Sequence, residues 1–224
     1  MATQLDLQEQ EQLDAIKAFW KQYGNAITWL LVVVLGAYAA WNGWNYWQRD
    51  QAVKAGAMFD ELERSTQAGD AERSARVFKD LQERYASTTY AAQAGLLTAR
   101  VQLDKGQADA ARASLAWVAD KGGDDALRTM AKLRLAGLML DAKQHDDALK
   151  QLDGATAAGF EALVADRRGD VLLAKGQKAE AQKAFETAYQ GLDAQLDYRR
   201  LVEAKLTALG AAPAPAVAAS GAAR

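Results

Sequence analysis

The sequence contains no cysteine, only two prolines and a single histidine among its 224 residues. Without cysteine, the chain has no disulfide bonds, no cysteine-ligated zinc or iron centre and no thiol nucleophile. The net charge of −2 shows no excess of positive charge of the kind that indicates nucleic-acid binding. Fifty alanines and few prolines favour helix, because alanine is the best helix former and proline the worst. The composition therefore predicts an all-α protein.

Charged residues are also absent from one long stretch, residues 22–48. Inside it, residues 26–41 read AITWLLVVVLGAYAAW, and a helix needs about 20 such residues to cross a hydrocarbon core about 30 Å thick. Tyrosines and tryptophans lie on both sides of this run. Tyr23 and Trp44 are 21 residues apart, which is about 31 Å of helix. This spacing is typical of the two aromatic belts of a membrane-spanning helix and predicts a transmembrane anchor over 22–48.

A cleaved signal peptide is the alternative interpretation of this segment. Residues 37–39 (AYA) have the small-x-small form of a cleavage site. A signal peptide begins with a short positive segment, however, whereas residues 1–21 carry the acids Asp6, Glu9, Glu11 and Asp14. The sequence therefore favours an uncleaved anchor behind a short tail, residues 1–21. Lysines and arginines flank both sides about equally, so their charges alone do not set the orientation.

Small residues form a stripe on the anchor at Gly36, Ala40 and Gly43. Such spacing lets a second helix backbone approach closely within lipid, so these three residues are candidates for helix packing in the membrane. The alternative is that they are the ordinary glycine and alanine of a membrane helix. The sequence leaves both interpretations open.

A short phrase recurs after the anchor, with spacings of 37, 37 and 33 residues: Gly69-Asp70, Gly106-Gln107, Lys143-Gln144 and Gly176-Gln177. Five residues after the start of each phrase lies a small residue: Ser74, Ala111, Ala148 and Ala181. Four residues further lies a large apolar one: Phe78, Leu115, Leu152 and Phe185. Another small residue lies twelve positions before the last three of the small set: Ala99, Ala136 and Gly169. These offsets match the tetratricopeptide pattern of paired helices.

The pattern predicts a tetratricopeptide-like helical solenoid over residues 49–210. Its expected helices lie near 50–67, 71–84, 90–104, 108–120, 125–141, 145–153, 160–175, 179–190 and 197–209. An ordinary bundle of alanine-rich helices is the alternative, but it does not account for the register of the repeated phrase. Residues 211–224 (AAPAPAVAASGAAR) contain prolines and no large apolar group, and are expected to be disordered.

Catalytic and metal-binding patterns are weak throughout the sequence. His145 precedes Asp146 and Asp147, but two acids at the start of a helix are also favoured by the helix dipole. Residues 168–170 spell the integrin tripeptide RGD, but within an expected helix and with Gly169 at a packing position. No phosphate-binding loop or dinucleotide fingerprint is present. We therefore expect no enzyme activity, no cofactor and no metal site.

A binding surface remains as the candidate site. In solenoids of this kind the first helix of each repeat lines the concave face. By register, the candidate partner-binding residues there are Gln93, Leu96, Arg100, Met130, Leu133, Asp166, Asp170 and Leu173, together with Leu103, Leu140 and Leu163. The alternative for each leucine is that it belongs to the core inside its own repeat.

Three phrases of the sequence resemble one protein family when they are taken in order. They are QLDAIKAFWK at residues 12–21, WNYW at residues 44–47 and VADRRGD at residues 164–170. They are similar to segments of the ancillary SecYEG translocon subunit family, and the resemblance extends over roughly residues 10–209. Residues 211–224 are a departure from the family pattern.

The resemblance implies a bacterial inner-membrane protein with a cytoplasmic amino terminus and a periplasmic repeat domain. It implies association with the SecYEG translocon and with a membrane-anchored periplasmic chaperone of prolyl-isomerase type. The expected function is that of a non-enzymatic, membrane-tethered adaptor that helps newly secreted proteins pass to periplasmic chaperones. Two alternatives stay open: a scaffold or regulator of envelope-stress signalling, and a structural protein that associates with itself.

Overall fold

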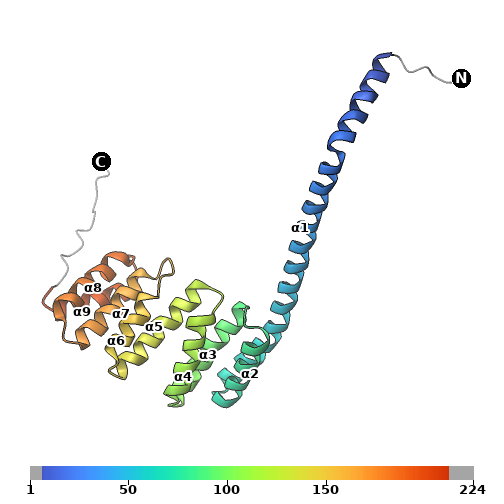
Figure 1. Ribbon diagram of the computed structural model, residues 1–224. Coiled ribbons are helices and arrows are strands. Elements are labelled where there is room, and N and C mark those ends of the chain that lie inside the picture. Colours follow the sequence, from blue (N-terminus) through green and yellow to red (C-terminus); the bar gives the residue numbers. More distant parts are fainter. Residues whose placement is uncertain (1–6, 212–224) are drawn as a thin grey trace, which may run out of the picture. The chain divides into compact units, whose positions relative to one another are not determined.

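The computed structural model describes residues 7–211, and every regular element in that range is an α-helix (Figure 1). The all-α prediction is therefore confirmed. The helices are α1 (Leu7–Gln67), α2 (Ala71–Arg84), α3 (Thr89–Asp104), α4 (Ala108–Lys121), α5 (Asp125–Asp141), α6 (His145–Asp153), α7 (Glu161–Ala174), α8 (Lys178–Gly191) and α9 (Asp197–Ala208). Except for α1, their ends lie within one residue of those expected from the sequence. The chain divides into two compact units, with the boundary between Gln51 and Ala52.

Helix α1 is longer than the sequence analysis expected. A separate helix was predicted to begin at residue 50, but α1 continues without interruption from Leu7 to Gln67. No proline or turn residue occurs at residues 48–51 (QRDQ), so no local signal ends the helix there. The expectation that residues 211–224 are disordered concerns, apart from Ala211, residues outside the described part of the chain.

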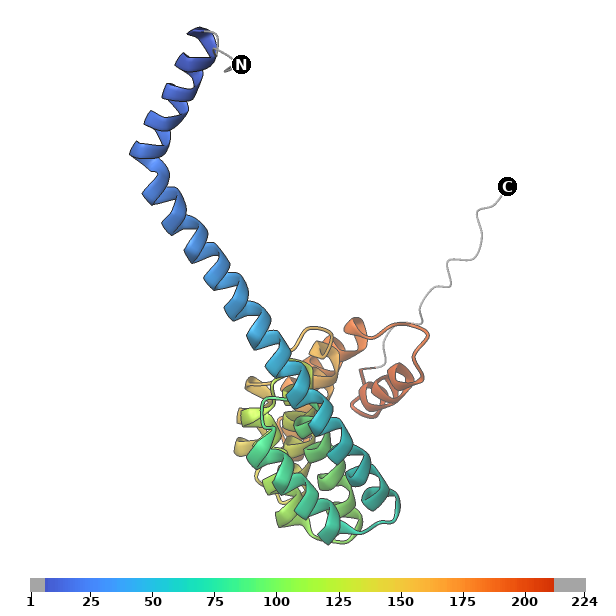
Figure 2. The same cartoon turned by 90° about the vertical axis from the view of Figure 1, so that its right-hand side faces the viewer.

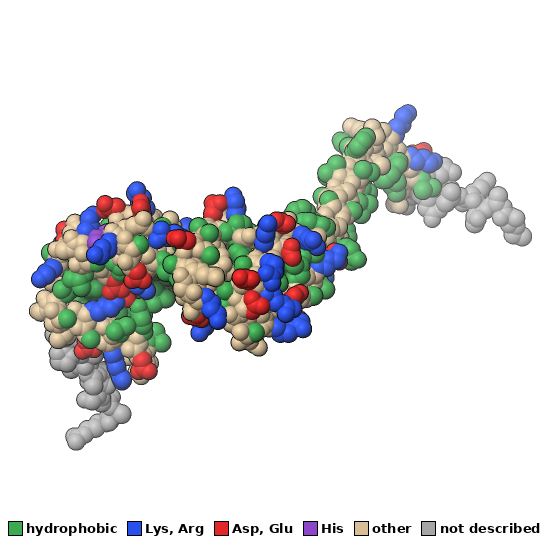
Figure 3. Space-filling model, turned by 90° about the horizontal axis from the view of Figure 1, so that it is seen from below, with side chains coloured by type: hydrophobic (Ala, Val, Ile, Leu, Met, Phe, Trp, Pro, Cys, Tyr) green, Lys and Arg blue, Asp and Glu red, His purple; other side chains and the backbone are tan. Residues whose placement is uncertain are grey.

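The first unit exposes its apolar side chains. Leu30, Leu35 and Trp41 are 63%, 64% and 68% exposed. By length and composition α1 could cross a membrane, since an 18-residue window of it reaches a mean hydropathy of 1.5. Figure 3 shows hydrophobic side chains along the part of α1 in view. The predicted anchor therefore lies in the one described helix with the composition of a membrane span.

The second unit buries its apolar side chains between consecutive helices. Neighbouring helices pack in sequence order, α2 on α3, α3 on α4 and so on to α8 on α9 (Figures 1 and 2). The core is correspondingly divided into small clusters along the stack. Leu62 and Phe78 belong to the first, Leu115 to the next, Leu152 to the third and Phe185 to the last. Such a distributed core is typical of a repeat protein.

The recurring phrase forms the carboxyl-terminal cap of four helices. Gly69, Gly106 and Gly176 have φ of 65°, 74° and 85°, and Lys143 takes the same left-handed conformation with φ of 59°. The following residue in each case donates its backbone N–H to a carbonyl five residues earlier, at 2.7–2.9 Å: Asp70 to Ser65, Gln107 to Gln102, Gln144 to Met139 and Gln177 to Leu172. This is the Schellman motif, in which a left-handed residue ends the helix.

The small and large residues of the repeat occupy the expected positions. The four small residues after the caps are fully buried, and the four large apolar residues are at most 4% exposed. Close packing is most severe at Gly169, where an added Cβ would lie 2.4 Å from Cε1 of Phe185. A larger side chain there would force two helices apart, so the repeat register is confirmed at the level of packing.

Candidate partner-binding cleft

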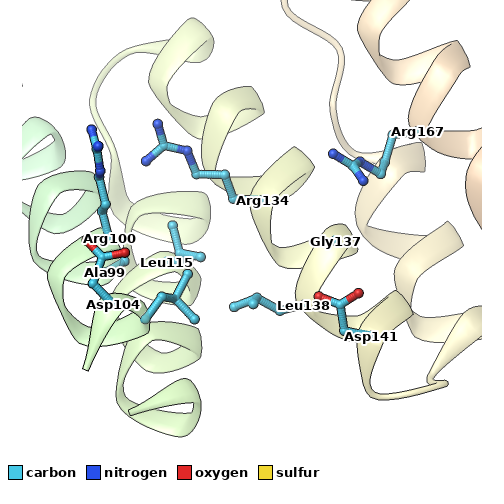
Figure 4. Close-up of a pocket in the computed structure, with 10 residues that line it drawn as sticks. Ala99, Arg100, Asp104, Leu115, Arg134, Gly137, Leu138, Asp141 and Arg167 are labelled. Atoms are coloured by element: carbon cyan, nitrogen blue, oxygen red, sulfur yellow. The ribbon is translucent and has the colours of Figure 1, made fainter. Parts of the chain in front are cut away.

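A cleft of about 330 Å³ lies between α3, α5 and α7 (Figure 4). These are the first helices of successive repeats, the helices that were expected to line the concave face. Its lining residues are Ala99, Arg100, Leu103, Asp104, Leu115, Arg134, Gly137, Leu138, Asp141 and Arg167. None of these lining residues is a serine, threonine, cysteine, lysine, tyrosine or histidine, and the only proton-accepting side chains among them are the carboxylates of Asp104 and Asp141.

The charged residues of the cleft are separated by sign. In Figure 4 the guanidinium groups of Arg100, Arg134 and Arg167 lie on one side, and the carboxylates of Asp104 and Asp141 lie on the other. The sequence explains this separation. Both aspartates are the last residues of their helices, α3 and α5, whereas Arg100 and Arg134 lie one and two turns earlier.

Arg134 makes two polar contacts within the repeats, although it is exposed. Its Nη1 donates to the carbonyl oxygen of Leu96 at 3.2 Å, and its Nη2 lies 3.8 Å from the sulfur of Met130. Burial lowers the pKa of Arg134 below its usual value because it desolvates the guanidinium, and the nearby positive charge of Arg100 lowers it further. Within the described residues, neither Arg100 nor Arg134 has a carboxylate within 4 Å. The guanidinium groups of Arg100 and Arg134 are therefore not neutralised by an ion pair, whereas that of Arg167 is paired with Asp170 at 3.6 Å.

Two of the candidate partner-binding residues, Arg100 and Leu103, line the cleft. Arg134 and Arg167 were missed, although each lies nine residues before its loop residue, Lys143 or Gly176, and so shares one register position. This shared position in the repeat is the sequence signal from which both arginines could have been predicted. Leu173 is 38% exposed, which leaves it accessible, although it does not line the cleft.

Leu96 was predicted to lie on the partner-binding surface, but it is buried. It is only 5% exposed and packs in the cluster that contains Ala92 and Ala99. The reason is helical spacing, since Leu96 lies four residues after Ala92 and three before Ala99 and so shares their buried face. The remaining candidates of the first two repeats are half-buried: Gln93, Met130 and Leu133. Met130 and Leu133 pack against core clusters, which supports the alternative interpretation for these positions.

Asp166 and Asp170 also serve an internal contact. The Nζ of Lys205 lies 2.8 and 2.9 Å from the two carboxylate oxygens of Asp166 and 2.7 Å from Oδ1 of Asp170. The hydroxyl of Tyr198 donates to Oδ2 of Asp166 at 2.5 Å. Burial, followed by this hydrogen bond, raises the pKa of Tyr198, and burial raises the pKa of Asp170. Since Asp166 is 1% exposed, the two acids fasten α9 to α7 rather than face a partner.

The weaker motifs have structural explanations. Asp146 accepts a hydrogen bond from Lys175 at 2.6 Å, which lowers the pKa of Asp146, and Asp147 pairs with Lys150 at 3.2 Å. The tripeptide at residues 168–170 lies inside α7. Searched over the described residues, the chain has no group of three or more histidines and acids that could hold a metal ion.

The small-residue stripe lies on α1, in the first unit. Gly36, Ala40 and Gly43 share a helix face because they are four and then three residues apart. A Cβ added at Gly36 or Gly43 would meet no other atom within 4 Å. The predicted role of the stripe in helix packing remains a prediction.

Known proteins similar to this chain agree with the fold. The family model described as a tetratricopeptide repeat-like domain matches residues 17–211. A solved structure, that of the MamA RS-1 ArsTM double mutant, covers 70% of this chain and 94% of its own with a TM-score of 0.50. At 16% identity, this second similarity speaks for the fold alone.

Curated relatives are similar over most of the chain. A protein of Escherichia coli (strain K12) is 33% identical over 178 residues, which are 80% of this chain and 85% of the relative. A protein of Neisseria gonorrhoeae is 31% identical over 208 residues, or 91% of this chain and 98% of the relative. A protein of Haemophilus influenzae is 29% identical over 184 residues, which are 82% of this chain and 90% of the relative. All three are named ancillary SecYEG translocon subunit, and this chain belongs to that family.

Proposed function

We propose that this protein is a non-enzymatic, membrane-tethered adaptor at the SecYEG translocon that helps newly secreted proteins pass to periplasmic chaperones. The observation that carries the proposal is the similarity to the Neisseria relative over 91% of this chain and 98% of the relative. The matched region includes both the apolar part of α1 and the repeats. The relative's association with the translocon is therefore attributed to the whole architecture and not to a common repeat alone.

The apolar helix supplies the tether in this proposal. Residues 22–48 would span the inner membrane, with the amino terminus in the cytoplasm and residues 49–210 in the periplasm. Tethering raises the local concentration of the repeats beside the channel exit, so even weak contacts with emerging chains become populated. The exposure of Leu30, Leu35 and Trp41 supports the assignment, because such side chains are stable in lipid and unfavourable in water.

The repeats supply the contact surface. Their cleft has apolar and charged lining residues and none of the usual nucleophiles, which suits binding better than catalysis. The proposed partners are a membrane-anchored periplasmic chaperone of prolyl-isomerase type and newly secreted chains. The family to which the chain belongs suggests the same non-catalytic role.

Co-purification in mild detergent, followed by mass spectrometry, tests the proposal. The full-length protein is expected to bring down subunits of the SecYEG channel and a periplasmic chaperone. Recovery of envelope-stress signalling proteins in their place would favour the regulatory alternative. Recovery of its own chain alone would favour self-association. The intact mass of the purified protein, measured in parallel, should include Trp20, as an uncleaved anchor requires.

Replacing residues 22–48 by an unrelated single span separates tethering from specific helix packing. If proximity is sufficient, the exchanged protein keeps its association with the channel. If association is lost while membrane insertion is retained, the stripe of Gly36, Ala40 and Gly43 makes a specific contact. A version without any span that still co-purifies as well as the full-length protein would contradict the tether model.

A further inference from the structure

The charges of the cleft are arranged unfavourably for the protein by itself. Arg134 is partly desolvated beside the positive charge of Arg100. Asp104 and Asp141 lie at the last residues of α3 and α5, where the helix dipole is negative, and neither helix has a basic residue in its last turn. Acids at this end of a helix are destabilising, and bases there are stabilising. A ligand with a negative group near the arginines and a positive group near the aspartates would offset both unfavourable sets of charges.

Four of the five charged residues of the cleft form no ion pair within the described residues. In the described part of the chain, no ion pair within 4 Å involves Arg100, Arg134, Asp104 or Asp141. Arg167 has one long pair, 3.6 Å from Asp170. The opposite charges of the cleft therefore do not neutralise one another across it.

An apolar surface lies between the two charged sides. Leu115 forms its fully buried part and Leu138 is half-buried (Figure 4). Leu103, which also lines the cleft, is 37% exposed. Arg134 and Asp141 are seven residues apart on α5, which corresponds to about 10 Å along the helix axis. An extended chain advances about 3.3 Å per residue, so about three residues of a ligand bridge the two sides. The volume of about 330 Å³ lies within the range of ligand sites.

We propose that this cleft binds an extended segment of a partner protein in which an acidic and a basic side chain lie about three residues apart, with an apolar side chain between them. The acidic group pairs with Arg100, Arg134 and Arg167, and the basic group pairs with Asp104 and Asp141. The apolar side chain rests on Leu103 and Leu138. This inference rests on the proposed adaptor function and specifies the kind of segment that the adaptor recognises.

The test uses the full-length protein in mild detergent and a fluorescent peptide with the sequence Ala-Glu-Leu-Ala-Lys-Ala. A control peptide carries glutamine in place of both glutamate and lysine. Fluorescence anisotropy is expected to show binding of the charged peptide at least about tenfold tighter than that of the control, since charge-assisted hydrogen bonds are stronger than neutral ones. Raising the salt concentration should reduce this difference. Equal affinity for the two peptides would overturn the proposal.

Variants locate the binding on the protein. Arg100→Gln and Asp141→Asn, at two exposed positions, should each weaken binding of the charged peptide about tenfold and leave the control peptide unchanged. Matched controls are Arg76→Gln and Asp80→Asn on α2, both exposed and outside the cleft, and they should change nothing. Equal losses in the cleft variants and the α2 variants would place the binding elsewhere and overturn the proposal. Far-ultraviolet circular dichroism confirms that all four variants are folded.

Co-purification of the same variants distinguishes this inference from the proposed function. If peptide discrimination fails while the wild-type protein still brings down channel subunits, only the cleft assignment is overturned. If the peptide binds as expected but no channel subunit is recovered, the adaptor function fails and the cleft assignment stands.

Discussion

Residues 7–51 and residues 52–211 are both helical and rich in apolar side chains, but they place those side chains in opposite surroundings. Leu30 and Leu35 in the first region are 63% and 64% exposed, whereas Leu62, Leu81 and Leu115 in the second are 0% exposed. The difference in sequence is one of arrangement. A continuous apolar run covers every face of its helix, whereas apolar residues three and four apart cover one face and leave the others polar. The first arrangement has the composition of a membrane span, and the second buries its apolar face against a neighbouring helix.

Four helical glycines show the same contrast, two in each region. At Gly36 and Gly43 an added Cβ would have open space. At Gly95 and Gly169 it would lie 2.4 Å from a side chain of the next helix, Val118 or Phe185. Glycine at these two positions of the repeats is therefore required by packing already present in the chain. In the first region it leaves a surface that another helix could approach.

The largest expected effect comes from Phe185, which is fully buried in the last core cluster. Phe185→Ala should lower the free energy of unfolding of the repeats by about 4 kcal/mol, because it leaves a cavity as well as removing buried area. Urea unfolding of the full-length protein in detergent, followed by circular dichroism, measures this loss. Trp41→Ala is the matched control in the first region and should leave the transition unchanged. A similar loss for both would contradict the contrast between the two regions.

The next effect concerns the ion pairs that fasten α9. Lys205→Met should destabilise the repeats by about 3 kcal/mol, because it leaves the buried carboxylate of Asp166 without its cation. The double variant with Asp166→Asn removes that stranded charge and should recover a large part of the loss. Unfolding midpoints of the two variants check this. A double variant less stable than Lys205→Met alone would show that the Asp166 carboxylate is not stranded without Lys205 and stabilises the fold through its other contacts, such as the hydrogen bond from Tyr198.

A smaller effect is expected at the helix crossings. Ala148→Leu should destabilise the repeats by about 2 kcal/mol, because extra methylene groups do not fit at a fully buried position. Ala116→Leu is the control, since Ala116 lies exposed on α4 and leucine is nearly as good a helix former as alanine. Thermal melts compare the two. If both variants melt like the wild type, the crossing is not as tightly packed as the structure indicates.

The smallest effect is a gain in stability at Lys143, the non-glycine residue among the four caps of the recurring phrase. Lys143→Gly should raise the free energy of unfolding by about 0.5–1 kcal/mol, because glycine adopts the left-handed conformation without the steric penalty of a Cβ. Gly176→Lys makes the opposite change at the equivalent position and should lower it by a similar amount. Differential scanning calorimetry resolves both shifts. Shifts of the same sign in the two variants would contradict the equivalence of the caps.

Local signals predicted much of this fold from the sequence. The helix ends after residue 67 lie within one residue of expectation, because the caps at Gly69, Gly106 and Gly176 are formed by adjacent residues. The continuous helix through residue 50 was missed, since nothing in QRDQ marks either a start or a stop. The candidate binding surface remains a prediction. Arg100 lines the cleft, whereas Leu96 and Asp166 are buried.

Sequence alone determined the apolar span, the period of the repeats and the small residues at the crossings, because each depends on neighbours within a few turns of the same helix pair. Only the tertiary structure decided that Arg100, Arg134 and Arg167 meet at one cleft and that Lys205 reaches back to Asp166. These contacts join residues more than thirty positions apart. They depend on how each helix pair rotates on the one before it, and that rotation is set by the summed packing of many side chains.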